Sequence, residues 1–134
     1  VVNPTGPYGR TGVRGIVEAY CGGPNLVNNY IDAGGRMKEP RPREIFSSDE
    51  DTAKKVSDDA IRFLAIGLSH LMNILSPDVI VIGGGQSYRP IYRQLNRITK
   101  EYTFSTIKNN VRIVRHKLGD SAGVYGAAVL IFDD

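Results

Sequence analysis

A run of four β-branched apolar residues, Val79–Ile82, constrains the fold of this chain more than any other feature. Pro77 lies just before the run and Gly83 ends it. A continuous apolar stretch without alternation is typical of a strand that is covered on both faces, as in the centre of an α/β sheet. We therefore predict a doubly covered strand over residues 79–82 that ends in a glycine turn.

Helical sequence patterns flank this strand on both sides. Between Ala53 and Leu75, apolar residues recur at spacings of three and four, which predicts one long amphipathic helix or two helices with a restart at Ser57. Ser47 and Glu50 have the spacing of a capping box, so we expect this helical segment to begin at Ser47. Further elements are expected as short helices from Pro24, from Pro90 and over residues 121–132, with a second strand over residues 111–116. This order is typical of an α/β fold with helices flanking the sheet.

The composition is that of one ordinary globular domain. With 134 residues, 41% of them hydrophobic, the chain is long enough to bury a core. The net charge of +3 is small, and the basic run between Arg36 and Arg43 is interrupted by Glu39 and two prolines, so we predict a solvated loop and no nucleic-acid binding through this chain. No apolar run approaches the roughly 20 residues that span a bilayer, and residues 1–7 lack the order of a signal peptide. We expect a cytoplasmic location and no membrane contact.

The glycine turn after the predicted strand is the first candidate site. It consists of Gly83, Gly84, Gly85 and Gln86. Glycine lets the backbone approach a ligand closely, and ligands of open α/β sheets gather beyond the carboxyl ends of the strands. Amide groups here, together with the start of the helix at Pro90, could face a nucleotide, or the turn could simply connect strand and helix. The segment matches neither the dinucleotide fingerprint nor the Walker A pattern.

Three other features have ordinary structural interpretations when they are taken alone. The glycine- and alanine-rich segment 119–128 predicts a helix with a small-residue face suited to close packing. Glu18 follows a glycine-rich loop, where a single glutamate is usually solvated. His70 and His116 have no cysteine, serine or acidic partner at a telling spacing, so the sequence supports no nucleophile–base pair.

Three segments in order along the chain carry a resemblance to a known family. The first is the loop that ends in Gly-Ile-Val-Glu-Ala-Tyr at residues 15–20, the second runs from Asn73 to Gly85, and the third from Leu118 to Ala128. Together they resemble the C-terminal part of the ROK family, which is named for repressors, open reading frames and kinases. The resemblance covers nearly all 134 residues.

This resemblance implies a two-lobed, actin- and hexokinase-like architecture with RNase H-like lobes, each a mixed sheet with flanking helices. Residues 1–134 would form the C-terminal lobe of a sugar kinase. ATP and a hexose or amino sugar would meet between the lobes, where an aspartate base takes the proton of a sugar hydroxyl and Mg²⁺ balances the charge of the phosphates. By the same resemblance, Glu18 contacts sugar hydroxyls, and residues 83–86 lie along the adenosine. Homo-oligomers are also expected.

The chain departs from the family pattern at a zinc site. The three family cysteines fall on Gly9, Thr11 and Ile16, whose side chains are not zinc donors, and Cys21 is offset from the pattern. A single cysteine also excludes an internal disulfide. We predict no structural zinc, and a loop that is held by its prolines, its packing or a partner chain.

A second departure concerns catalysis. In the family, the catalytic aspartate and the phosphate loop come from the first lobe, which would precede Val1, so we expect this chain alone to be an inactive kinase lobe. Two other interpretations stay open at this point. The chain could be the sensor lobe of a ROK repressor, or a non-catalytic α/β oligomerisation module.

Overall fold

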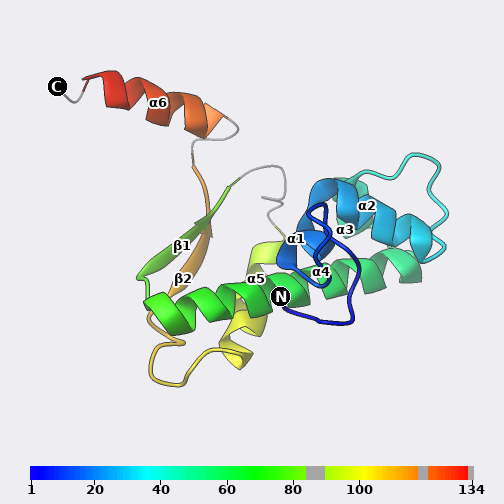
Figure 1. Ribbon diagram of the computed structural model, residues 1–134, viewed down its shortest axis with the longest axis horizontal. Helices are drawn as coiled ribbons and strands as arrows, with labels where there is room; N and C mark the ends of the chain where they lie inside the picture. The colour runs from blue at the N-terminus through cyan, green and yellow to red at the C-terminus, as the bar shows by residue number, and fades with distance from the viewer. Residues whose placement is uncertain (84–89, 118–120, 133–134) are drawn as a thin grey trace.

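The computed structural model describes residues 1–83, 90–117 and 121–132. The elements of this described part, in chain order, are α1 (Val17–Cys21), α2 (Gly23–Asp32), α3 (Pro42–Ser47), α4 (Asp51–Leu75), β1 (Val79–Ile82), α5 (Ile91–Glu101), β2 (Arg112–Arg115) and α6 (Ala122–Phe132). In Figure 1, α4 runs through the body of the molecule, with α1, α2 and α3 near its first half and the two strands beyond its last turn. The expected α/β architecture with flanking helices is confirmed.

The long helix α4 is a single helix of 25 residues. It does not restart at Ser57, which is buried inside it and donates its hydroxyl to the Ile45 carbonyl at 3.3 Å. The helix ends at Ser76, whose φ of 45° is left-handed, and the next residue, Pro77, cannot continue the helical hydrogen bonds.

The capping-box prediction at Ser47 is wrong. Ser47 is the last residue of α3, and α4 begins at Asp51 with Glu50 as its N-cap. The physical reason is Pro42, which starts a separate short helix because its fixed φ suits the first helical position. This six-residue helix is followed by extended backbone at Ser48, with ψ of 145°.

Two apolar clusters cover α4 from Ala53 to Leu68. The first joins α2, α3 and the first half of α4 through Leu26, Tyr30, Ile45, Ala53, Val56 and Ala60. The second joins the second half of α4 to α5 and β2 through Ile61, Ala65, Leu68, Ile91, Leu95 and Ile113. Each large apolar side chain buried in this way contributes roughly 1.5–3 kcal/mol. The helical spacing seen in the sequence therefore marks the core correctly up to Leu68, whereas Leu71 and Leu75 of the same pattern are 47% and 67% exposed.

The described sheet consists of two parallel strands, with Val79 of β1 opposite Arg112 of β2. The predicted strands are confirmed, but the prediction that β1 is covered on both faces is wrong for the described chain. Ile80 and Ile82 are half-buried against the second cluster. Val79 and Val81, on the opposite face, are 43% and 58% exposed, because no described element lies over them.

The last helix, α6, confirms the helix predicted near the C-terminus, but its small-residue face has no described neighbour. A Cβ added at Gly123 or Gly126 would meet no atom within 4 Å. Val124 and Tyr125 are 73% and 59% exposed, and Figure 1 shows the helix extending away from the body of the molecule. Among the helices that the structure describes, none is both long and apolar enough to cross a bilayer.

Candidate functional site

The N-terminal loop is held by backbone hydrogen bonds around Gly15. The amides of Val2 and Asn3 donate to the Gly15 carbonyl at 2.7 and 3.1 Å, and the Gly15 amide donates to Pro7 at 2.9 Å. Gly15 has a φ of +60°, and a Cβ added to it would lie 1.5 Å from the Asn3 carbonyl oxygen. Because the chain passes so close to Asn3 at this point, residue 15 must be glycine.

A buried tyrosine attaches this loop to α4. The Tyr20 ring stacks on Phe63 with centroids 4.0 Å apart, and its hydroxyl accepts a hydrogen bond from Asn3 Nδ2 at 2.7 Å. A tyrosine hydroxyl is protonated at neutral pH, and burial raises the pKa of the Tyr20 hydroxyl further. The loop is thus held both by the backbone hydrogen bonds at Gly15 and by the Tyr20 side chain.

The residues at the family cysteine positions do not fit a zinc ion. The Ile16 side chain packs against Gly9, where a Cβ would lie 2.5 Å from Ile16 Cδ1. The Ile16 side chain thus fills the space beside Gly9, so these two positions make an apolar contact. The third family cysteine position is Thr11. Within the described residues, no group of three or more His, Cys, Asp or Glu side chains could hold a metal ion. That no zinc binds stays a prediction.

Glu18, the predicted sugar contact, lies on α1 between the loop and α2. Its Oε2 accepts a hydrogen bond from the Arg10 amide at 3.1 Å, and its Oε1 accepts one from Asn25 Nδ2 at 2.8 Å. A carboxylate has about four acceptor positions, so two are occupied and about two can accept hydroxyl groups. The structure therefore holds Glu18 in place from two sides.

Of the predicted nucleotide turn, the structure describes Gly83, and Gly84, Gly85 and Gln86 lie outside the described residues. Gly83 is exposed at the carboxyl edge of the parallel pair, where the His116 amide donates to the Ile82 carbonyl at 3.1 Å. This is the edge of a parallel sheet at which ligands usually bind.

A cavity of about 280 Å³ lies between the α3–α4 junction and the start of α5. Its apolar lining includes Phe46, Ile61 and Ile91. Its polar lining includes residues 47–49, Lys54 and Gln94. Pro90 also lines it, and this residue lies four positions after Gln86, the last residue of the predicted turn. Seven of its eleven lining residues are polar or charged, so this cavity is more polar than the usual small-molecule site.

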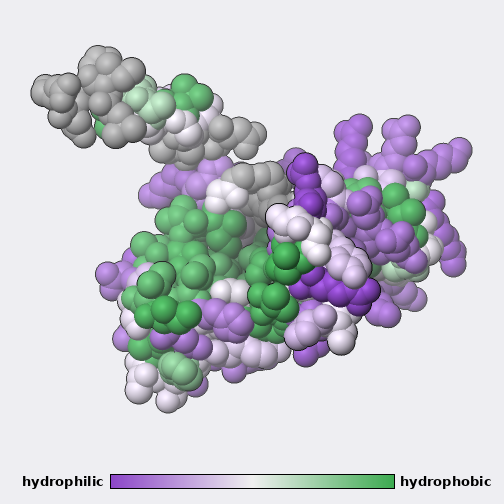
Figure 2. Space-filling model, viewed as in Figure 1, coloured by the Kyte–Doolittle hydropathy of each residue, from purple (hydrophilic) through white to green (hydrophobic). Residues whose placement is uncertain are grey.

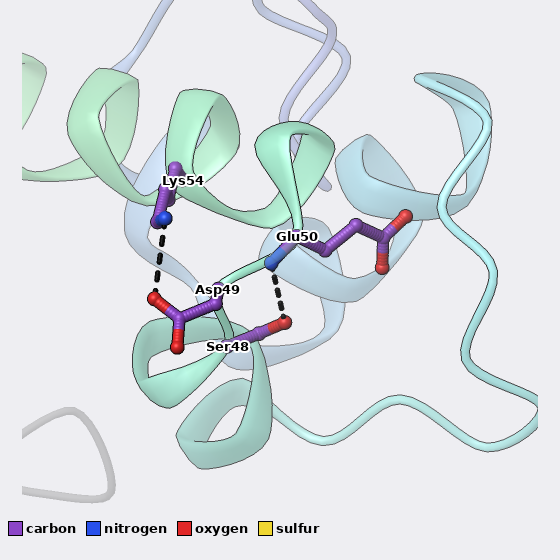
Figure 3. Close-up of polar contacts among 4 residues, drawn as sticks. All are labelled: Ser48, Asp49, Glu50 and Lys54. Carbon is purple, nitrogen blue, oxygen red and sulfur yellow. Dashed lines mark hydrogen bonds and ion pairs between the residues drawn. The ribbon is translucent and has the colours of Figure 1, made fainter.

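The polar rim of this cavity is ordered by the start of α4. Lys54 Nζ lies 3.2 Å from Asp49 Oδ1, and the Glu50 amide donates to Ser48 Oγ at 3.1 Å (Figure 3). Both partners of the ion pair are well exposed, so the pair contributes little to stability and leaves its charges available to a ligand. The sequence interpretation missed this cavity because it combines residues 46–61 with residues 90–94, and no motif spans that separation.

Comparisons with known proteins identify the family. A family model described as the ROK family matches residues 1–134. This chain belongs to the ROK family. The resemblance inferred from the three sequence segments is therefore confirmed.

The ROK chain is similar to sugar kinases along most of its length. It is 32% identical over 123 residues to an N-acetyl-D-glucosamine kinase of Vibrio atlanticus (strain LGP32), a match that covers 89% of this chain and 40% of the relative. A crystal structure of a ROK hexokinase from Thermus thermophilus superimposes with a TM-score of 0.79 at 26% identity, covering 98% of this chain and 46% of the other. These relatives confirm the actin- and hexokinase-like fold class.

A regulator has a similar fold. The crystal structure of a ROK family transcriptional regulator, a homologue of the E. coli MLC protein, gives a TM-score of 0.76 at 20% identity, covering 96% of this chain and 36% of the other. At that identity the likeness concerns the fold alone. The chain spans about 40% of the length of the curated relative described above.

Proposed function

We propose that this ROK chain is the C-terminal lobe of an ATP-dependent sugar kinase, which transfers a phosphoryl group from ATP to a hydroxyl of a hexose or amino sugar. The observation that carries the proposal is the cavity between the α3–α4 junction and the start of α5, which Phe46, Lys54 and Pro90 help to line. The similarity to an N-acetyl-D-glucosamine kinase over 89% of the chain supports it.

In this proposal the cavity and the turn bind the nucleotide. Phe46, Ile61 and Ile91 offer apolar surface to the faces of the adenine base. Asp49 and Lys54 lie on the rim, within reach of polar groups of the nucleoside. Residues 83–86 run along the adenosine, where glycines allow close approach of the backbone.

Glu18 is the proposed sugar contact. Its carboxylate is held by the Arg10 amide and by Asn25, so it is oriented before the sugar arrives, and its unused acceptor positions suit sugar hydroxyls. Mg²⁺ bound to the phosphates supplies charge neutralisation. The aspartate base and the phosphate loop are proposed to come from a part of the protein outside these 134 residues, so the chain by itself binds ligands without turnover.

Two assays test this proposal. Isothermal titration calorimetry should detect ATP binding to the 134-residue chain, and a coupled kinase assay with glucose and N-acetyl-D-glucosamine should detect no phosphorylation. Absence of ATP binding would contradict the nucleotide site. Turnover by the chain alone would contradict the assignment of the catalytic groups to another segment.

A second candidate is the sensor lobe of a ROK repressor, favoured by the fold likeness to the MLC homologue. The two functions are distinguished by the product of the complete gene. A kinase phosphorylates the sugar, whereas a repressor binds operator DNA and releases it when sugar is added. We propose that the complete protein works as a homo-oligomer in the cytoplasm, which size-exclusion chromatography with light scattering and cell fractionation would test.

A further inference from the structure

The hydroxyl of a buried tyrosine joins α2 to the first turn of α4. Tyr30 is 0% exposed. Its hydroxyl donates to the carboxylate of Glu50 and accepts hydrogen bonds from the amides of Arg36 at 2.8 Å and Met37 at 3.1 Å. The Arg36 amide also donates to Glu50 Oε1 at 3.2 Å. A Cβ added at Gly35 would lie 2.1 Å from the Tyr30 ring, so the loop closes directly over this ring.

Glu50 connects this hydroxyl to the wall of the cavity. It is the N-cap residue of α4, yet among the described residues its carboxylate bonds Tyr30 and Arg36 and makes no cap hydrogen bond. Its backbone amide donates to Ser48 Oγ, and its carbonyl accepts the Lys54 amide at 2.9 Å. In Figure 3 the Glu50 carboxylate points away from Asp49 and Lys54. The Glu50 side chain is thus held by Tyr30 and Arg36, and the Glu50 backbone bonds to Ser48 and Lys54. Both Ser48 and Lys54 line the cavity.

We propose that Tyr30 and Glu50 are positioning residues for the nucleotide cavity, holding the wall formed by residues 48–54 at its distance from α5. The inference rests on the proposed function, since it assigns the cavity to the nucleotide. Hydrogen bonds to a carboxylate are stronger than neutral ones, and an amide left without its acceptor in a buried site is unfavourable. Loss of the Tyr30 hydroxyl therefore removes one of the two bonds that hold the Glu50 carboxylate, and leaves the Met37 amide without its acceptor.

The first test measures ATP affinity of the 134-residue chain by isothermal titration calorimetry. Tyr30→Phe keeps the ring and removes the hydroxyl, and we expect it to weaken ATP binding roughly five- to tenfold, the effect of about one hydrogen bond. Glu50→Ala should weaken binding by a similar factor, and the double variant by less than the product of the two factors, because both changes remove the shared Tyr30–Glu50 bond. Glu50→Gln keeps an acceptor for the hydroxyl and should restore affinity to within about twofold of the unaltered chain.

Ser69→Ala provides a matched control. Ser69 is 1% exposed and donates its hydroxyl to Ile66 at 2.7 Å, farther along α4. This variant also loses one buried hydroxyl, so it should lose stability without losing ATP affinity. An equal loss of ATP affinity in Ser69→Ala and Tyr30→Phe would overturn the proposal, because a general loss of folding stability would then explain both.

Hydrogen exchange separates this inference from the proposed function. Tyr30→Phe should speed exchange of the Lys54 amide, which donates to the Glu50 carbonyl, and of the Met37 amide, which loses its acceptor, while the later turns of α4 stay protected. Failure of the unaltered chain to bind ATP would contradict the proposed function, and the exchange comparison would still decide whether Tyr30 holds this wall. Unchanged exchange, or unchanged ATP affinity in a folded Tyr30→Phe chain, would overturn the inference.

Discussion

The two ends of α4 differ in how the described chain covers them. At its start, Ala53, Val56 and Ala60 are at most 8% exposed beneath α2 and α3. At its end, Ile74 and Leu75 are 78% and 67% exposed. The apolar spacing of the sequence is the same at both ends, so the spacing alone does not tell which part of the protein supplies the cover.

The exposed end of α4 belongs to a wider apolar surface. Figure 2 shows hydrophobic residues gathered over the region that Figure 1 assigns to the last turns of α4 and to the strands, with mainly hydrophilic residues around α2. Val79 and Val81 of β1 and Phe104 are exposed together with Leu71 of α4. Surfaces of this kind in a monomer usually mark contacts with other protein segments. The comparison between a covered and an open end leads to five predictions.

The largest expected difference is between leucines at the two ends. Leu26 is 0% exposed in the first cluster and Leu75 is 67% exposed. Leu26→Ala should lower the free energy of unfolding by about 2–5 kcal/mol through lost burial and a cavity. Leu75→Ala should change it by less than about 0.5 kcal/mol. Urea unfolding followed by circular dichroism measures both, and equal losses would contradict the division of α4 into a covered and an open end.

The second prediction concerns the loop packed beside the covered end. Gly15→Ala places a Cβ 1.5 Å from the Asn3 carbonyl oxygen at a φ of +60°, so the loop must open, and we expect a loss above about 2 kcal/mol. Gly12 has a φ of +77° with open space around it. Gly12→Ala is therefore a control in which alanine has an unfavourable left-handed φ but no clash, and it should lower the free energy of unfolding by roughly 1 kcal/mol. Thermal unfolding of the two variants compares them. Similar melting temperatures would show that the close approach of Gly15 to Asn3 does not exist in solution.

The third prediction uses the single cysteine at the covered end. Cys21 donates its thiol to the Ala60 carbonyl at 3.2 Å, and burial raises the pKa of this thiol from 9.0 to about 12. At pH 8 its reaction with Ellman's reagent should be much slower than that of glutathione and should become fast in urea. A fast reaction in the folded chain would contradict the cover over this end.

The same pKa shift predicts a pH dependence of stability. Because the folded pKa of Cys21 lies above the unfolded value of 9.0, the unfolded chain loses this proton first as pH rises. The stabilisation is present below pH 9.0 and is lost progressively up to about pH 12. Cys21→Ser, with its weakly acidic hydroxyl, should lack this component of the alkaline decline. An identical decline in both chains would contradict the shift.

The smallest expected effect is at the open face of β1. Val81 is 58% exposed, so Val81→Thr should change the free energy of unfolding of the chain by less than about 0.5 kcal/mol. It should also reduce self-association, measured by light scattering, because it removes apolar surface. A loss of stability comparable to that of a core substitution would show that this face is covered in solution.

The sequence predicted those parts of the fold that depend on local pattern. The β-branched run 79–82, the apolar spacing of residues 53–75 and Pro77 each determine the structure within a few residues of their own positions. The exposure of Val81 could not be predicted, because apolar character does not specify which segment covers a strand. The short helix α3 was missed because six residues are too few for a periodic signal.

The candidate site, like the fold, has one part that the sequence predicted and another that it did not. Glu18 was found through the family resemblance, but its bonds to the Arg10 amide and Asn25 depend on how a loop and two helices meet. The cavity and the Tyr30–Glu50 contact join residues 20 positions or more apart. Their assembly follows from tertiary packing, for which a single sequence carries no local signal.

The most direct test of the central proposal is a nuclear magnetic resonance titration of the 134-residue chain with a non-hydrolysable ATP analogue. We predict shift changes at the amides of Ser48, Lys54 and Gln94, which line the cavity, and at Gly83 of the proposed nucleotide turn. The amides of the exposed last turn of α4 should stay unchanged. Shift changes confined to other surfaces, or none at saturating analogue, would contradict the assignment of this cavity to the nucleotide.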